Sequence, residues 1–152
     1  MTIDDDIDKK ILNIIQTNFP IHSRPYKIIA DKLEIGEEQL IDRVKKMKQD
    51  QFIRRIGGNF SPDKLGYYST LCTAQVPENK IELFVNTVNA YKGVTHNYKR
   101  NHKFNIWFTF IALSNKIIKE NLNRISKKTG VKTILNLPAV KVFKISANFK
   151  FQ

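Results

Sequence analysis

The chain has 152 residues and a mass of 17.7 kDa, and its 41% apolar and 26% charged residues are typical of a folded, soluble protein. No apolar run approaches the roughly 20 residues of a transmembrane helix. The aspartates at positions 4–6 are the reverse of a targeting signal. We therefore expect a cytoplasmic protein that does not enter a membrane. The single cysteine, Cys72, excludes an internal disulfide framework and a cysteine-cluster metal site.

Positive charge is unevenly distributed along the chain. The formal net charge is +12, yet residues 1–60 carry 11 Lys and Arg against 10 Asp and Glu, whereas residues 61–152 carry 15 against 4. An excess of this size attracts polyanions such as nucleic acid, anionic lipid, or a small ligand with several carboxylates or phosphates. The alternative is a set of solvated lysines spread over exposed helix faces.

Residues 1–60 are predicted to form a winged helix-turn-helix domain. Apolar residues at helical spacing predict helices over residues 5–17 and 37–50. Between them, Ser23 is expected to cap a second helix that has Pro25 in its first turn. The segment 52–60 is interpreted as a short β-hairpin, the wing.

This arrangement favours DNA recognition by the third helix, but its charges argue against it. Glu37 and Glu38 stand at the start of that helix, where they would face phosphates unfavourably. Arg43 on the helix and Arg54 and Arg55 on the wing either contact phosphate or form a solvated face. The residues alone therefore leave DNA binding open but disfavoured.

Residues 61–152 are predicted to form a ferredoxin-like domain. Strands are expected over residues 66–76, 94–100 and 104–112. One helix is expected after Pro77, and a second from the cap at Ser114 to Gly130. Alternating apolar and polar residues over 143–151 predict the last strand. The resulting β-α-β-β-α-β order gives an α+β protein with a ferredoxin-like second domain.

The third strand of this domain is apolar on both faces. One face carries Phe104, Ile106, Phe108 and Phe110, and the other carries Trp107 and Ile111. A sheet covered by helices on one side needs apolar residues only on that side. The second apolar face therefore implies a partner subunit that packs sheet to sheet, with Trp107 either in the dimer core or on the wall of a ligand pocket.

Two histidines lie close together in the segment 95–102. Side chains alternate along a strand, so His96, Tyr98 and Arg100 are expected on one side, with His102 just past the strand end. Imidazole rings that exchange protons near neutral pH would then stand beside a phenol and a guanidinium. The segment lacks the carboxylate or thiolate of a metal site. Three interpretations stay open: acid–base chemistry on an anion, anion binding without chemistry, or a hydrogen-bonded strand end.

Several segments resemble a known family. The order of elements resembles the Lrp/AsnC transcription regulators, and the finer match is to the siroheme decarboxylases, which are similar to the proteins of heme d1 synthesis. The segments that carry this resemblance are 18–20 with 23–26, 53–58, 65–67 with 69–71, 135–138 and 143–145, and, most specifically, 93–98 with Arg100, His102, Asn105 and 107–109.

The resemblance implies an activity, namely removal of the carboxylates from the acetate side chains at ring positions 12 and 18 of siroheme. The products are 12,18-didecarboxysiroheme and carbon dioxide, on the alternative route to heme. Family members usually pair with a paralogous subunit, so we expect a heterodimer, or a homodimer, through the ferredoxin-like domain. The iron belongs to the siroheme substrate, so we expect no cofactor and no metal site of the protein's own.

The residue pattern fits this implication, because siroheme carries eight carboxylates and loss of carbon dioxide requires delivery of a proton. The candidate catalytic residues are His96, His102 and Tyr98. The candidate substrate-binding residues are Arg100, Asn97, Lys99, Lys103 and Trp107. The alternatives are a DNA-binding regulator of the Lrp/AsnC type and a non-catalytic, tetrapyrrole-binding partner subunit.

Overall fold

The chain forms two compact units in a computed structural model that describes residues 5–58, 60–144 and 148–151. The first unit comprises the chain up to Gly58 together with the C-terminal residues from Lys144, and the second runs from Asn59 to Phe143. The second unit therefore ends earlier than the predicted domain 61–152, because the C-terminal residues belong with the first unit.

Three helices build the first unit: α1 (Asp6–Thr17), α2 (Pro25–Lys32) and α3 (Glu37–Gln49). The carboxylate of Asp5 caps α1 by accepting hydrogen bonds from the backbone N–H groups of Ile7 and Asp8, at 2.8 and 3.2 Å. The helices enclose a core of aliphatic side chains: Ile11, Leu12, Ile29, Ala30, Leu40, Val44, Met47 and Ile53. The helix-turn-helix prediction is confirmed.

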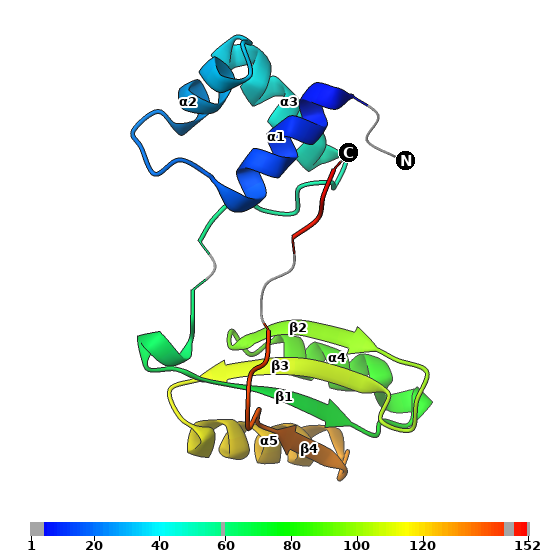
Figure 1. Cartoon of the computed structure of the whole chain (residues 1–152). Coiled ribbons are helices and arrows are strands. Elements are labelled where there is room, and N and C mark those ends of the chain that lie inside the picture. The colour runs from blue at the N-terminus through cyan, green and yellow to red at the C-terminus, as the bar shows by residue number, and fades with distance from the viewer. Residues whose placement is uncertain (1–4, 59, 145–147, 152) are drawn as a thin grey trace. The chain divides into compact units, whose positions relative to one another are not determined.

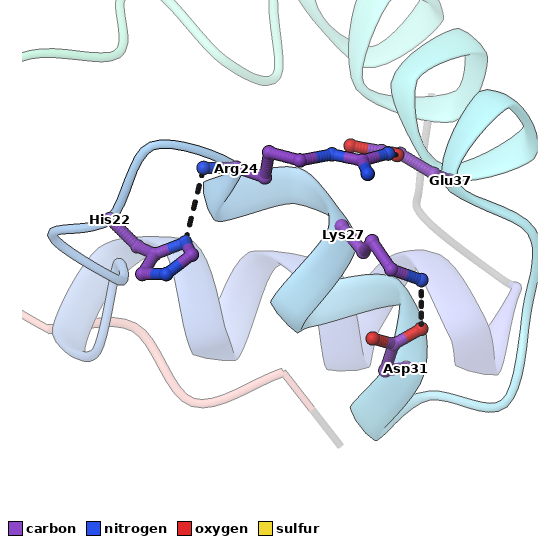
Figure 2. Close-up of polar contacts among 5 residues, drawn as sticks. All are labelled: His22, Arg24, Lys27, Asp31 and Glu37. Carbon is purple, nitrogen blue, oxygen red and sulfur yellow. Dashed lines mark hydrogen bonds and ion pairs between the residues drawn. The ribbon is translucent and has the colours of Figure 1, made fainter.

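Two local predictions in this unit are wrong. Arg24, not Ser23, occupies the N-cap of α2, and its side chain makes no capping hydrogen bond. Its backbone N–H instead donates to Nδ1 of His22, at 3.1 Å (Figure 2). The predicted wing over residues 52–60 is not formed by the part of it that the structure describes, because residues 52–58 and 60 contain no strand. A two-stranded hairpin is marginal by itself, and Gly57 and Gly58 offer no side chains for pairing.

The predicted strand over residues 143–151 is also wrong for the residues that the structure describes, since 143–144 and 148–151 form no strand. The C-terminal residues bind α1 instead. The carboxamide of Asn13 donates to the carbonyl of Phe151 at 2.9 Å, and the backbone N–H of Phe149 donates to Gln16 at 2.9 Å. Phe151 packs against the core of the first unit. The aromatic alternation marks an apolar face whose partner is a helix rather than a neighbouring strand.

The second unit is a four-stranded antiparallel sheet with two helices on one face (Figure 1). Its elements are β1 (Tyr68–Ala74), α4 (Ile81–Asn89), β2 (Val94–Lys99), β3 (Ile106–Ala112), α5 (Asn115–Thr129) and β4 (Ile134–Leu137), with single 3-10 turns at Asp63–Leu65 and Glu78–Lys80. The strand order is β2-β3-β1-β4. The ferredoxin-like β-α-β-β-α-β fold is confirmed, but its last strand is β4.

The core of this unit lies between the sheet and its helices. Phe108 and Phe110 on β3 are buried against Phe84 of α4 and Ile118 of α5. The α5 boundaries agree with the sequence, since Ser114 accepts a hydrogen bond from the N–H of Ile117 and Gly130 ends the helix at φ +67°.

Cys72 lies in the same core and is fully buried. Burial raises the pKa of its thiol to about 12, so it stays protonated and acts as a small apolar side chain. Among the helices of the described residues, none has both the length and the apolarity that crossing a membrane requires.

Candidate functional site

The sheet of the second unit has one face that its own helices leave open. Ile106, Phe108 and Phe110 of β3 are buried on the helix side, so the alternate residues Trp107 and Thr109 point to the open face. In the antiparallel register Trp107 pairs with Tyr98, and Thr109 pairs with His96. Cross-strand partners share a face. His96 and Tyr98 therefore lie on the open face.

Four of the predicted site residues come together there. The rings of His96 and Tyr98 stack with centroids 6.1 Å apart, and the Arg100 guanidinium lies 5.2 Å from the ring centroid of Trp107. The Trp107 indole is held by a 2.7 Å hydrogen bond from its Nε1 to the carbonyl of Phe104. An exposed imidazole, phenol and guanidinium thus lie beside the fixed indole ring of Trp107. This set can deliver a proton and bind an anion.

A β-bulge shapes β2 just before His96. Val94 pairs with Phe110 and His96 pairs with Thr109, which leaves Thr95 as an extra residue in β2. The alternation of side chains along the sequence gives no sign of this extra residue. A glycine at the start of a strand does signal a close backbone approach. A Cβ at Gly93 would lie 2.1 Å from the carbonyl oxygen of Ile111.

Two predicted substrate-binding residues point to the other side of β2. Asn97 pairs with the buried Phe108, and its amide nitrogen donates to the side-chain oxygen of Asn89 on α4, at 2.9 Å. Its own amide oxygen is buried without a hydrogen-bond partner among the described residues. Lys99 forms a 2.6 Å ion pair with Glu78. Asn97 thus connects β2 to α4 and does not face the side of the sheet that carries His96. Lys99 is paired with the carboxylate of Glu78.

His102 and Lys103 lie in the connection between β2 and β3. His102 stacks on Phe104 with ring centroids 6.3 Å apart, and its Nδ1 accepts the Phe104 backbone N–H at 3.1 Å. These contacts keep His102 within the connection, and its catalytic role stays a prediction. Lys103 borders a cavity of about 440 Å³ between residues 75–77 and 130–133. Lys132 also lines this cavity, and the sequence carries no signal for that placement because it depends on how the α5–β4 loop folds.

The open face also carries exposed apolar side chains. Its exposed members include Leu71 of β1 and Leu135 and Leu137 of β4, which are 43%, 39% and 40% exposed. Single exposed leucines are ordinary, but a contiguous group on one sheet face is typical of an interaction surface. Within the described residues, no group of three or more His, Cys, Asp or Glu is placed to hold a metal ion.

Two arginines of the helix-turn-helix unit are engaged by acids. At the start of α3, Arg24 forms an ion pair with Glu37, and Figure 2 shows the two side chains lying together. Arg43 of α3 binds Asp8 at 2.8 Å and Asp5 at 3.1 Å. Hydrogen bonds to these carboxylates raise the pKa of Arg43, and the hydrogen bond from Arg43 lowers the pKa of Asp5. Arg43 therefore turns toward α1.

The fold and site define a class: a helix-turn-helix unit followed by an Lrp/AsnC-type ligand-binding unit. Residues 64–144 match the family described as AsnC-like ligand binding domain, and residues 8–54 match the siroheme decarboxylase NirDL-like HTH domain. The chain is also similar to the siroheme decarboxylase alpha subunit of Oleidesulfovibrio alaskensis, with 50% identity over 96% of this chain and 88% of that protein. It belongs to the siroheme decarboxylase family.

Solved structures agree with this placement. The crystal structure of the siroheme decarboxylase NirDL is 33% identical with a TM-score of 0.70, covering 97% of this chain and 48% of that one. The chain thus spans about half the length of NirDL. The NirDL complex with an iron-uroporphyrin III analogue matches with a TM-score of 0.69 at 31% identity, over 93% of this chain and 48% of that one. Escherichia coli AsnC, 19% identical with a TM-score of 0.78 over 97% of this chain and 99% of that one, shows the shared fold alone.

Proposed function

We propose that this chain is a catalytic siroheme decarboxylase subunit that removes carbon dioxide from the acetate side chains at ring positions 12 and 18 of siroheme, giving 12,18-didecarboxysiroheme. The observation that carries the proposal is the group of His96, Tyr98, Arg100 and Trp107 on the open sheet face of a strongly basic unit. Relatives at about half identity that bear the name siroheme decarboxylase alpha subunit support it.

The chemistry requires one proton for each carboxylate lost. When the bond from the side-chain methylene to the carboxylate breaks, its electron pair stays on the methylene carbon, which takes a proton and becomes a methyl group. His96 donates that proton as general acid in this proposal, with Tyr98 stacked on its ring. His102, one connection away, is the second candidate donor.

Two cationic side chains of the second unit bind the siroheme macrocycle in this proposal. Arg100, held over Trp107, and Lys103 beside its cavity hold carboxylates that stay on the macrocycle. The flat, apolar part of the ring packs on the Trp107 side of the sheet. The iron arrives with siroheme and is part of the substrate, so the protein supplies no metal ligand set and no cofactor of its own.

A second subunit covers the open face in this proposal. Leu71, Leu135 and Leu137 offer an apolar surface of the kind that a neighbouring sheet buries. The partner is a paralogous subunit or a second copy of this chain, which would enclose the macrocycle between two sheets.

Anaerobic incubation with siroheme tests the activity, with the product mass read for the loss of one or two carbon dioxide units. The assay compares this chain alone with this chain and a paralogous subunit. Turnover that needs the partner but disappears with His96→Ala in this chain supports a catalytic role here. Turnover that survives both His96→Ala and His102→Ala in the mixed assay makes this chain the non-catalytic, tetrapyrrole-binding subunit.

A DNA-binding regulator of the Lrp/AsnC type is the second candidate, since the first unit has the helix-turn-helix fold. The acids that engage Arg24 and Arg43 weaken this candidate, because phosphate neutralisation supplies most DNA affinity. A gel-shift titration at several salt concentrations separates the two functions. Sequence-selective binding with a steep salt dependence would establish the regulator.

A further inference from the structure

The β-bulge in β2 places two consecutive side chains on the same side of the sheet. In a regular strand, neighbours point to opposite faces. Here β2 advances two residues, from Val94 to His96, while β3 advances one, from Phe110 to Thr109. Thr95 is the extra residue, and a bulge of this kind re-aims the side chains around it.

The consequence is a contact that a regular strand does not permit. The Thr95 hydroxyl lies 3.0 Å from Nδ1 of His96, within hydrogen-bond distance. The bulge is anchored at its start by the backbone of Gly93, whose carbonyl accepts the N–H of Ile111 at 2.8 Å. Only a residue without a Cβ allows this approach.

We infer that Thr95 is a positioning residue for proton transfer by His96. This inference rests on the proposed role of His96 as proton donor. The Nδ1–H of His96 donates to the Thr95 hydroxyl oxygen, which fixes the ring orientation and leaves Nε2 as the nitrogen that faces the substrate. The hydrogen bond that one ring nitrogen makes sets which tautomer the other adopts.

The proton balance follows from this arrangement. Before transfer, His96 is an imidazolium with protons on both nitrogens. It gives the Nε2 proton to the methylene carbon that loses carbon dioxide, and the neutral ring keeps its proton on Nδ1, still hydrogen-bonded to Thr95. Without the hydroxyl, the neutral ring is free to adopt the other tautomer and to rotate away from the substrate.

The test is Thr95→Val in the full chain, because valine keeps the branched shape of threonine and removes only the hydrogen bond. We expect decarboxylation of siroheme to fall about tenfold, while the siroheme Kd changes less than twofold. Thr95→Ser should restore the rate. In ¹⁵N–¹H NMR spectra of the ligand-free protein, the neutral His96 ring should carry its proton on Nδ1 in the wild type and in Thr95→Ser, and shift toward Nε2 in Thr95→Val.

A double variant separates positioning from a general effect on the fold. If Thr95 acts through His96, adding Thr95→Val to the His96→Ala variant should not lower the decarboxylation rate any further. The matched control is Thr17→Val, which removes an exposed hydroxyl that donates to the Asn13 carbonyl in the first unit and should leave the rate unchanged.

Three results would overturn the inference: a wild-type rate in Thr95→Val, a His96 tautomer that does not depend on Thr95, or additive losses in the double variant. If instead His96→Ala keeps full activity, His96 is not the proton donor and the proposed mechanism fails with it. The NMR result then still reports whether the Thr95 contact exists.

Discussion

The two units carry the same number of cationic side chains but use them differently. Each has thirteen Lys and Arg, whereas the first unit has ten Asp and Glu and the second has four. Of the seven ion pairs found among the described residues, six lie in the first unit and one, between Lys99 and Glu78, lies in the second. Among the described residues, five cations of the first unit are therefore paired with acids, against one in the second unit.

This difference in pairing bears on where an anionic ligand can bind. A cation already paired with a carboxylate contributes little potential to an incoming anion. In the second unit Arg100 stacks on Trp107, and Lys103 lines a cavity that no acidic side chain borders among the described residues. Three pairs of matched variants, with one variant in each unit, and one pH comparison within the first unit test this contrast.

The largest effect is expected from the histidines. His96→Ala should lower the decarboxylation rate by about 10²-fold or more, because it removes the general acid, while siroheme still binds. His22→Ala in the first unit is the matched control, since His22 only accepts a hydrogen bond from the Arg24 backbone. Full activity of the His96 variant would exclude it as the proton donor.

The second-largest effect is expected from two glycine substitutions. Gly93→Ala places a Cβ 2.1 Å from the carbonyl oxygen of Ile111, so the two strands must separate. We expect the second unit to lose about 2 kcal/mol of unfolding free energy, measured by calorimetry or denaturant titration. Gly57→Ala in the first unit meets nothing within 4 Å and should be close to neutral. Equal stability of the two variants would show that β2 and β3 do not approach this closely.

A pair of arginine variants tests the charge contrast directly. Arg100→Met should weaken siroheme binding about tenfold through the loss of charge-assisted hydrogen bonds. Its unfolding free energy should change by no more than the ~0.5 kcal/mol of an exposed cation–π contact. Arg43→Met should do the reverse, with unchanged siroheme binding and a loss of about 0.5–1 kcal/mol from its half-buried pair with Asp8. Titration of siroheme absorbance and thermal melts measure the two quantities.

The smallest effect concerns pH. The hydrogen bond from Arg43 lowers the pKa of Asp5, so the folded state keeps this carboxylate ionised at a pH where the unfolded chain protonates it. This contribution to stability is complete above about pH 4 and is lost as the pH falls through the folded pKa. Melting curves of Arg43→Met and the wild type should therefore differ more at pH 6 than at pH 2. A difference that grows on acidification would contradict the assignment.

Local sequence patterns were sufficient for most elements. The helices of both units, the Ser114 cap and the Gly130 stop depend on residues within a turn or two of each other. The two-residue alternation placed His96, Tyr98 and Arg100 on one side, which the stack on Tyr98 and the contact with Trp107 match. Their catalytic and binding roles stay predictions.

Elements that depend on a distant partner were decided by the tertiary structure. The alternation of residues 143–151 shows that one side of that segment is apolar, but not that Phe151 packs in the first unit while β4 takes the sheet edge. The bulge at Thr95 is likewise invisible to alternation, because it appears only when β2 is aligned with β3. Sequence alone determined the helices, the basic second unit and the identity of the chemical groups, since these follow from near neighbours. Pairing across the sheet decided which side chains meet, since backbone hydrogen bonds between distant strands set that register.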